Sequence, residues 1–240
     1  MKYAVISDVH IMDWGDPASL LLEKFLTHPL TVECDEVFLL GDIFDLMVGS
    51  QSNYLKKYPV FFTLTGKLIE KGIRVHFIEG NHDFHLQGIM SGIEYRVGGV
   101  ERSEGGKKIY FGHGDELERF NYSYQLYKSI IRSYPLKTLA NWVPYSVIEK
   151  VGTWMSKTSK EHNKKKYQFQ ESSDTKASYR SHMDYWFKNT SWDMIVCGHS
   201  HVSDHYQNND KQYLNNGYAQ HTKTFLYLNN FEPEFVALAE

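Results

Sequence analysis

The chain has 240 residues and a mass of 28.0 kDa, the size of one large domain or of one domain with an insertion. It carries 26 Lys and Arg against 29 Asp and Glu, a net charge of -3, which argues against a general nucleic-acid binder. No apolar run approaches the roughly 18 residues of a membrane-spanning helix, and two cysteines, Cys34 and Cys197, make no disulfide scaffold.

Apolar runs and helical patterns alternate over the first 120 residues. A helix is expected where Asp16 can act as the N-cap and Pro17 as the first helical residue, and an amphipathic helix is expected over Tyr54–Lys71. Strands are expected at Lys2–Ser7, Glu36–Leu40, Ile73–Ile78 and Lys108–Phe111. This alternation predicts an α/β sheet with helices on its faces.

Residues 120–190 interrupt the alternation. They hold 14 of the 36 aromatic residues and 12 Lys and Arg against 5 Asp and Glu. Apolar residues repeat at helical spacing near the start of this segment and again after Pro144, and Asp174–Lys188 is a third helical stretch. We therefore predict a single domain over residues 1–240 with a helical insertion, or cap, at 120–190. Further strands are expected at Asp193–Cys197, Gln212–Leu214, Thr224–Leu228 and Glu234–Leu238.

Five of these apolar runs end in residue types that bind metal ions. The blocks are Asp8-Val9-His10, Gly41-Asp42-Ile43-Phe44-Asp45, Gly80-Asn81-His82-Asp83, Gly112-His113-Gly114 and Gly198-His199-Ser200-His201. In open α/β sheets, ligands bind beyond the carboxyl ends of the strands, so the five blocks can converge. A lone histidine is more often a surface or hydrogen-bonded residue than a ligand, but five such blocks in order favour two divalent ions, with Asp42 able to bridge them. Asp45, Asp83 and Asp115 are expected to orient these loops or to cap them.

In this order the blocks match D-x-H, GD-x-x-D, GNH-[DE], GH and GH-x-H, so the chain resembles the calcineurin-like metallophosphoesterases. The resemblance implies a metallophosphoesterase-type β-sandwich flanked by helices, with a dinuclear site. It implies that one ion binds Asp8, His10, Asp42 and His201, and that the other binds Asp42, Asn81, His113 and His199. His82 is then the catalytic residue, a hydrogen-bond or proton donor beside the phosphate. Mn²⁺ is the ion implied, although His and carboxylate ligands also suit Fe or Zn.

This ligand set predicts an enzyme. Two divalent ions lower the pKa of the water between them, and the resulting bridging hydroxide attacks phosphorus in line. A donor such as His82 contributes about 10²–10⁴-fold to the rate. The motifs therefore predict hydrolysis of a phosphoester or a phosphoanhydride.

Nearly the whole chain is similar to the UDP-2,3-diacylglucosamine hydrolase family of the lipid A pathway. The segment Ser159-Lys160-Glu161, with Asn163 and Lys166, falls where that family places polar contacts to its glucosamine phosphate. The resemblance implies hydrolysis of UDP-2,3-diacylglucosamine to UMP and 2,3-diacylglucosamine 1-phosphate. The substrate contacts that it implies are Asn121, Ser159, Asn163 and Lys166.

Two positions depart from that family's best-known members, which carry Arg at the position of His82 and Asp at that of Asn121. A second hypothesis is therefore open, in which the enzyme acts on another nucleoside diphosphate lipid or on a soluble nucleotide or phosphodiester. A metal-bound scaffold without turnover is disfavoured because every ligand type is present. A nuclease is disfavoured because the chain lacks a long basic groove.

The expected partners follow from this chemistry. They are a nucleotide-sugar lipid substrate and the anionic surface of the inner membrane, which suits the basic, aromatic insertion. No nucleic acid and no obligate protein partner is inferred. Asp8 stands too early for the apolar part of a signal peptide, and two cysteines suit a reducing compartment. We therefore expect a cytoplasmic protein, peripheral on the inner membrane.

Overall fold

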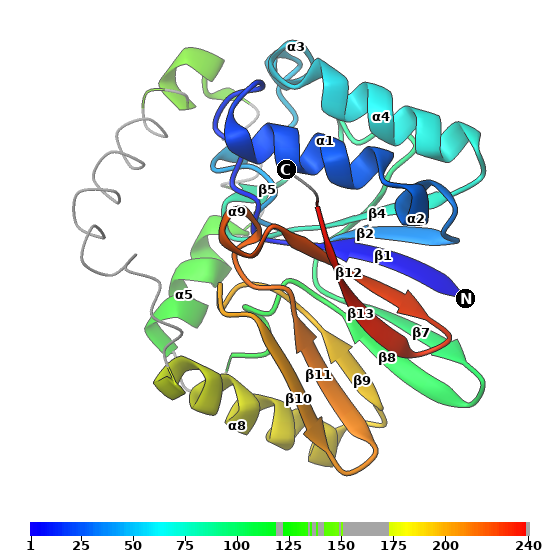
Figure 1. The fold of residues 1–240 in the computed structure, drawn as a ribbon. Helices are drawn as coiled ribbons and strands as arrows, with labels where there is room; N and C mark the ends of the chain where they lie inside the picture. The colour runs from blue at the N-terminus through cyan, green and yellow to red at the C-terminus, as the bar shows by residue number, and fades with distance from the viewer. Residues whose placement is uncertain are drawn as a thin grey trace.

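Two β-sheets pack face to face, and helices cover the outer face of each sheet (Figure 1). The structure is a computed structural model, which describes residues 1–118, 122–133, 142–148 and 173–238, together with 135, 138 and 150. The two packed sheets with helices outside them confirm the flanked β-sandwich that the family resemblance implies.

The first sheet is mixed and has the strand order β13-β12-β1-β2-β4-β6. Strands β1, β2, β4 and β6 run parallel, whereas β12 and β13 run antiparallel at one side. The strands are β1 (Lys2–Ile6), β2 (Glu36–Leu39), β4 (Arg74–Ile78), β6 (Glu94–Arg96), β12 (Thr224–Asn229) and β13 (Glu232–Ala237). The short strand β6 was not predicted, and β13 begins two residues earlier than expected, through Pro233, which an edge strand tolerates.

The second sheet has the strand order β10-β11-β9-β8-β7, with β9 parallel to both of its neighbours. A separate two-stranded sheet pairs β3 with β5. These strands are β7 (Val100–Glu104), β8 (Lys107–Phe111), β9 (Met194–Val196), β10 (Asp204–Asn208), β11 (Lys211–Asn215), β3 (Met47–Val48) and β5 (Asp83–Phe84). Strands β3, β5, β7 and β10 were not predicted, because they are short or lack a continuous apolar run.

The period of two along each strand divides the core into layers. In β1, Tyr3 and Val5 pack between the two sheets, whereas Ala4 and Ile6 face the helices. Strand β2 repeats the pattern, so the strands at the centre of the first sheet are buried on both faces. This burial explains why these strands appear in the sequence as continuous apolar runs.

Helices α1, α2, α3, α4 and α9 pack on the outer face of the first sheet. They are α1 (Pro17–Thr27), α2 (Pro29–Val32), α3 (Asn53–Lys57), α4 (Pro59–Glu70) and α9 (Ala219–Thr222). Asp16 caps α1 as expected, because its carboxylate accepts the Ser19 N–H at 2.7 Å. The single helix expected over Tyr54–Lys71 is wrong: it is two helices, because Pro59 cannot continue α3 and instead starts α4.

The stretch predicted as an insertion contains α5 (Tyr122–Ile131) and α8 (Ser173–Asn189). Both agree with helical stretches expected from the sequence, whereas most of the stretch after Pro144 lies outside the described residues. Helix α8 packs Tyr179, Met183 and Phe187 on the outer face of the second sheet and so forms its helical layer (Figure 1). Among the described residues, no helix is both long and apolar enough to cross a bilayer.

A buried ion cluster lies at the amino end of β2, opposite the end that carries the metal-binding motifs. Glu36 is fully buried, and its carboxylate lies 2.6 Å from the His76 ring and accepts three bonds from Arg102, at 2.8, 3.0 and 3.1 Å. Arg74 also donates to it. Because Arg102 comes from β7, the cluster joins the two sheets.

Removing the Glu36 charge is expected to destabilise the fold in a pH-dependent way. Burial raises the pKa of Glu36, but His76 and Arg102 lower it by more than burial raises it. The pKa therefore falls from an ordinary 4.5 to about 2. The stabilisation is therefore complete above pH 4.5 and lost as pH falls to about 2. We expect Glu36→Gln to lower the free energy of unfolding by about 3 kcal/mol at pH 7, and the difference from wild type to shrink over that window.

Urea unfolding followed by circular dichroism across pH 2–7 measures this difference. Glu232→Gln, at an exposed position on β13, is the control and should match wild type throughout. A Glu36→Gln penalty that stays constant with pH would contradict the assignment.

Candidate metal centre

The five motif blocks follow five strands that end at the same side of the sandwich. Three of them follow β1, β2 and β4, which are parallel neighbours in the first sheet. The other two follow β8 and β9, a parallel pair in the second sheet. Because both sheets present carboxyl ends here, loops that are far apart in the sequence meet at one place.

Left-handed backbone is concentrated in these loops. Five of the seven residues predicted as ligands have φ between 52° and 67°, namely Asp8, His10, Asp42, His199 and His201. Such a conformation costs a non-glycine residue about 1–3 kcal/mol and persists only where the surroundings impose it. Here hydrogen bonds between the loops impose it: the N–H groups of Val9 and His10 both donate to the Asp42 carbonyl, at 2.9 and 3.0 Å.

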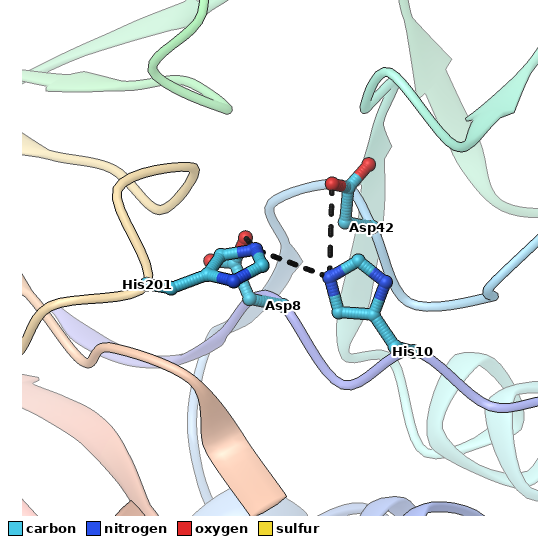
Figure 2. Close-up of side chains that lie close together, drawn as sticks. All are labelled: Asp8, His10, Asp42 and His201. Carbon is cyan, nitrogen blue, oxygen red and sulfur yellow. Dashed lines mark hydrogen bonds and ion pairs between the residues drawn. The ribbon is translucent and has the colours of Figure 1, made fainter. Parts of the chain in front are cut away.

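Four predicted ligands of one ion come together, as Figure 2 shows. The Nε2 atoms of His10 and His201 lie 3.2 Å apart. The Nε2 atom of His201 lies 3.3 Å from Asp8 Oδ1, and that of His10 lies 3.8 Å from Asp42 Oδ2. Two atoms that each bind one ion at about 2.1 Å lie about 3.0–3.4 Å apart, so this group needs little movement to hold a divalent cation.

The second predicted set also converges, beside the first. Asn81 Oδ1 lies 3.0 Å from His113 Nε2 and 3.1 Å from His199 Nδ1. The Nε2 atom of His113 lies 3.6 Å from Asp42 Oδ2. One carboxylate oxygen, Asp42 Oδ2, therefore faces both groups of donor atoms, which is the position that a bridging ligand requires.

A hydrogen bond behind one ring and a carboxylate behind another orient these two rings toward this centre. His113 is fully buried, and its Nδ1–H can donate to the Leu40 carbonyl at 2.8 Å, which leaves Nε2 as the bare nitrogen. The Nε2 of His199 faces Glu118 at 3.8 Å, while its Nδ1 faces Asn81. A carboxylate or carbonyl behind a ligating histidine is the usual arrangement at protein metal sites. Glu118 was not predicted.

A buried carboxylate joins the two central loops. Asp83 accepts four backbone N–H groups at 2.6 to 3.1 Å, those of Asp42, Ile43, Phe44 and Gly80. Asp83 thus orients the ligand loops, as expected. Gly41 lets them approach: its φ is 76°, and an added Cβ would lie 2.6 Å from the Gly80 Cα and 2.7 Å from His113 Nδ1.

Burial and nearby charges favour the protonation states that bind cations. Burial lowers the pKa of His10 to about 3, although Asp42 and Asp8 raise it, so its imidazole is neutral at pH 7. Burial raises the pKa of Asp42, but His113, His82 and His10 outweigh this effect and hold it well below its ordinary value. Neutral imidazole beside ionised carboxylate is a donor set that suits divalent ions of borderline softness.

His82 lies beside the group formed by Asp8, His10, Asp42 and His201. Its backbone N–H donates to Asp42 Oδ1 at 2.9 Å, and its ring packs edge-on against that of His10, with centroids 4.9 Å apart. The ring Nδ1 lies 2.8 Å from the Asp45 carbonyl, so Nδ1 carries the proton in the neutral ring. Its Nε2 is then left for another partner.

Two further residues, Asn215 at the end of β11 and Tyr218, contact the loop of His199 and His201 and were not predicted. Asn215 donates to the Gly198 carbonyl at 2.7 Å and to Ser200 at 3.1 Å. The Tyr218 ring stacks on His201, with centroids 5.4 Å apart. The sequence does contain a signal for Asn215: polar residues and a glycine, Asn215-Asn216-Gly217, follow the apolar pair Tyr213-Leu214, as in the five motif blocks. The predicted substrate contacts Asn121, Ser159, Asn163 and Lys166 lie outside the described residues.

Comparisons with known proteins identify relatives of this chain. The family model of the calcineurin-like phosphoesterases matches residues 1–203. The UDP-2,3-diacylglucosamine hydrolase of Psychromonas ingrahamii is 25% identical over 155 residues, which cover 63% of this chain and 63% of that protein. The match therefore spans less than two thirds of that relative's length.

A second relative aligns over more of the chain. The UDP-2,3-diacylglucosamine hydrolase of Blochmanniella pennsylvanica is 27% identical over 210 residues, which cover 84% of this chain and 79% of that protein. Among solved structures, a novel archaeal phosphodiesterase aligns with 98% of this chain and 99% of its own, at 13% identity and a TM-score of 0.49.

The Asp83 carboxylate is expected to be essential for the shape of the centre. In Asp83→Asn the new amide group would place N–H donors against backbone N–H donors, so we expect a loss of about 3 kcal/mol in stability together with weaker Mn²⁺ binding. Asp35→Asn is the matched control, because exposed Asp35 accepts a single N–H, from Lys2. Thermal unfolding and Mn²⁺ titration measure both effects, and an Asp83→Asn variant as stable as Asp35→Asn would refute this role.

Proposed function

Since the chain belongs to the calcineurin-like phosphoesterase family, we propose that it hydrolyses the pyrophosphate of UDP-2,3-diacylglucosamine, releasing UMP and 2,3-diacylglucosamine 1-phosphate. The observation that carries the proposal is the convergence of two donor groups on one oxygen of Asp42. The substrate is proposed from the similarity to curated UDP-2,3-diacylglucosamine hydrolases.

The proposed site holds two divalent ions, with Mn²⁺ as the proposed metal. Asp8, His10, Asp42 and His201 are the proposed ligands of one ion, and Asp42, Asn81, His113 and His199 those of the other. When bound, such ions activate water and neutralise charge on the phosphate. The chain supports this role through buried neutral imidazole at His10 and through rings held at their far nitrogens.

His82 is the proposed catalytic residue. The Asp45 carbonyl holds its Nδ1–H, so its Nε2 is the atom proposed to contact the phosphate or the leaving oxygen. Its backbone is also tied to Asp42, which keeps the ring at a constant distance from the ligand that both ions are proposed to share. A donor fixed in this way stabilises charge as it develops on the phosphate.

The insertion is proposed to select the substrate. Its residues Asn121, Ser159, Asn163 and Lys166 are the proposed polar contacts. Their proposed partner is the glucosamine phosphate. Because the substrate is acylated, the reaction is proposed to take place at the cytoplasmic face of the inner membrane, with the basic, aromatic insertion resting on anionic lipid.

A second candidate function is supported by His82 itself. The best-known diacylglucosamine hydrolases carry Arg at this position, and histidine is the residue of the general phosphoesterase motif. Histidine is shorter than arginine and cannot bind a phosphate in a bidentate manner. The alternative substrate is therefore another nucleoside diphosphate lipid or a soluble nucleotide or phosphodiester.

The two candidates are separated by paired substrates. With Mn²⁺ in detergent, we expect UMP release from UDP-2,3-diacylglucosamine and none from UDP-N-acetylglucosamine. Asp42→Asn should abolish turnover, because it removes the shared negative ligand. Equal turnover of the two substrates would favour the second candidate, and a generic phosphodiester cleaved in preference to both would overturn the proposed substrate.

Replacing His82 tests its catalytic role. We expect His82→Ala to lower kcat by about 10²–10⁴-fold while Mn²⁺ affinity stays close to that of wild type. His205→Ala, at an exposed position in β10, is the control. Steady-state kinetics and Mn²⁺ titration are measured on the same samples. If His82→Ala instead loses a metal ion at unchanged kcat under saturating Mn²⁺, His82 is a ligand and not the donor.

A further inference from the structure

Helix α5, the first helix of the insertion, is fixed to the loops that carry the proposed ligands. Its Gln125 donates to the carbonyls of Asp115 and Glu118, both at 3.2 Å. One turn further along, Lys128 pairs with Asp115 at 2.9 Å. Asp115 is buried and stands two residues after His113, so this face of α5 packs directly behind the fourth motif block.

Arg132, just after α5, extends this contact to the Asn81 loop. Its terminal nitrogen donates to the Gly80 carbonyl at 3.0 Å and lies 3.4 Å from Asp115 Oδ2. Its Nε lies 3.7 Å from Glu79 Oε2. The Arg132 side chain is only 12% exposed, and Asp115 and Glu79 are each 1% exposed, so these ion pairs are shielded from water.

The Gly80 carbonyl that accepts from Arg132 belongs to the peptide bond between Gly80 and Asn81. The Gly80 N–H donates to Asp83 at 3.0 Å, and its carbonyl accepts from Arg132, so the residue before Asn81 is held on both sides. Gly80 also packs closely against Asp42, because an added Cβ would lie 2.2 Å from Asp42 Oδ1. Releasing the carbonyl would let the Gly80–Asn81 peptide rotate and would move the Asn81 side chain.

We propose that Arg132 is a positioning residue for the second metal site, which reaches from the insertion to fix the Gly80–Asn81 peptide and so places Asn81 Oδ1 against His113 and His199. The inference rests on the proposed two-ion site. It makes the insertion part of the metal centre as well as the proposed substrate-binding segment. It also gives a reason for arginine at this position: a planar guanidinium spreads its five N–H donors over three nitrogens and so suits a carbonyl and two carboxylates that lie apart, whereas an ammonium offers three donors from a single nitrogen.

Lys128 provides a matched control on the same helix. It pairs with the same carboxylate, Asp115, but no contact joins it to the Gly80 loop among the interactions of the described residues. If Arg132 only docked α5 on the body of the protein, Lys128→Met and Arg132→Met would act alike. If Arg132 positions Asn81, only the Arg132 variant changes metal binding.

The test is calorimetric titration of Mn²⁺ into the metal-free 240-residue protein. Wild type should bind two ions, and Asn81→Ala should identify the ion at the second site by weakening it. We expect Arg132→Met to weaken that same ion by about 10–100-fold and to leave the other unchanged. Arg132→Lys should fall between Arg132→Met and wild type, and Lys128→Met should match wild type.

Three results would overturn the inference. The first is equal weakening of both ions in Arg132→Met, and the second is equal behaviour of Arg132→Met and Lys128→Met. In either case wild type still binds two ions and the proposed function stands. The third is a wild type that binds fewer than two ions, which would sink the two-ion site itself. Circular dichroism checks folding, and if Arg132→Met does not fold, Arg132→Lys carries the comparison.

Discussion

The carboxyl group of Asp83 accepts N–H groups from two loops, and the shape of the proposed metal centre depends on this one buried side chain. Three of its bonds come from the loop that begins at Asp42, and the fourth comes from Gly80, beside Asn81. Left-handed backbone at Asp42 is costly on its own, and the same hydrogen bonds that satisfy Asp83 hold it in place. Hydrogen bonds from within the protein therefore contribute to the shape of the loops that carry the proposed ligands.

The environment around the centre also determines which nitrogen of each ring faces inward. A backbone carbonyl takes the outer nitrogen of His113, and Glu118 faces the outer nitrogen of His199. Burial keeps His10 neutral, whereas the histidines around Asp42 keep that carboxylate ionised. Neutral ring nitrogens and an ionised carboxylate therefore lie side by side at the proposed centre. A bound divalent cation would stabilise this cluster of donor atoms.

The insertion gains a second role from its first helix. Three side chains at successive turns, Gln125, Lys128 and Arg132, contact the loops behind the proposed ligands, and two of them neutralise buried Asp115. At the other end of the segment, α8 covers the outer face of the second sheet. Residues 120–190 are therefore joined to the body at both ends, and the proposed substrate contacts lie between these two attachments in the sequence.

The sequence by itself determined the family, the sandwich and the residues that converge. Each proposed ligand ends an apolar run, and the ends of parallel strands meet at one edge, so local patterns were enough to bring Asp8, Asp42 and Asn81 together. The division of Tyr54–Lys71 at Pro59 also has a local cause, because proline cannot continue a helix. Only the tertiary structure decided the proposed roles of Glu118 and Arg132, because a charged side chain outside the metal-binding motifs is normally solvated and its sequence does not reveal a distant buried partner. The single oxygen of Asp42 that faces both donor groups was likewise decided by packing, since it depends on loops from two different sheets.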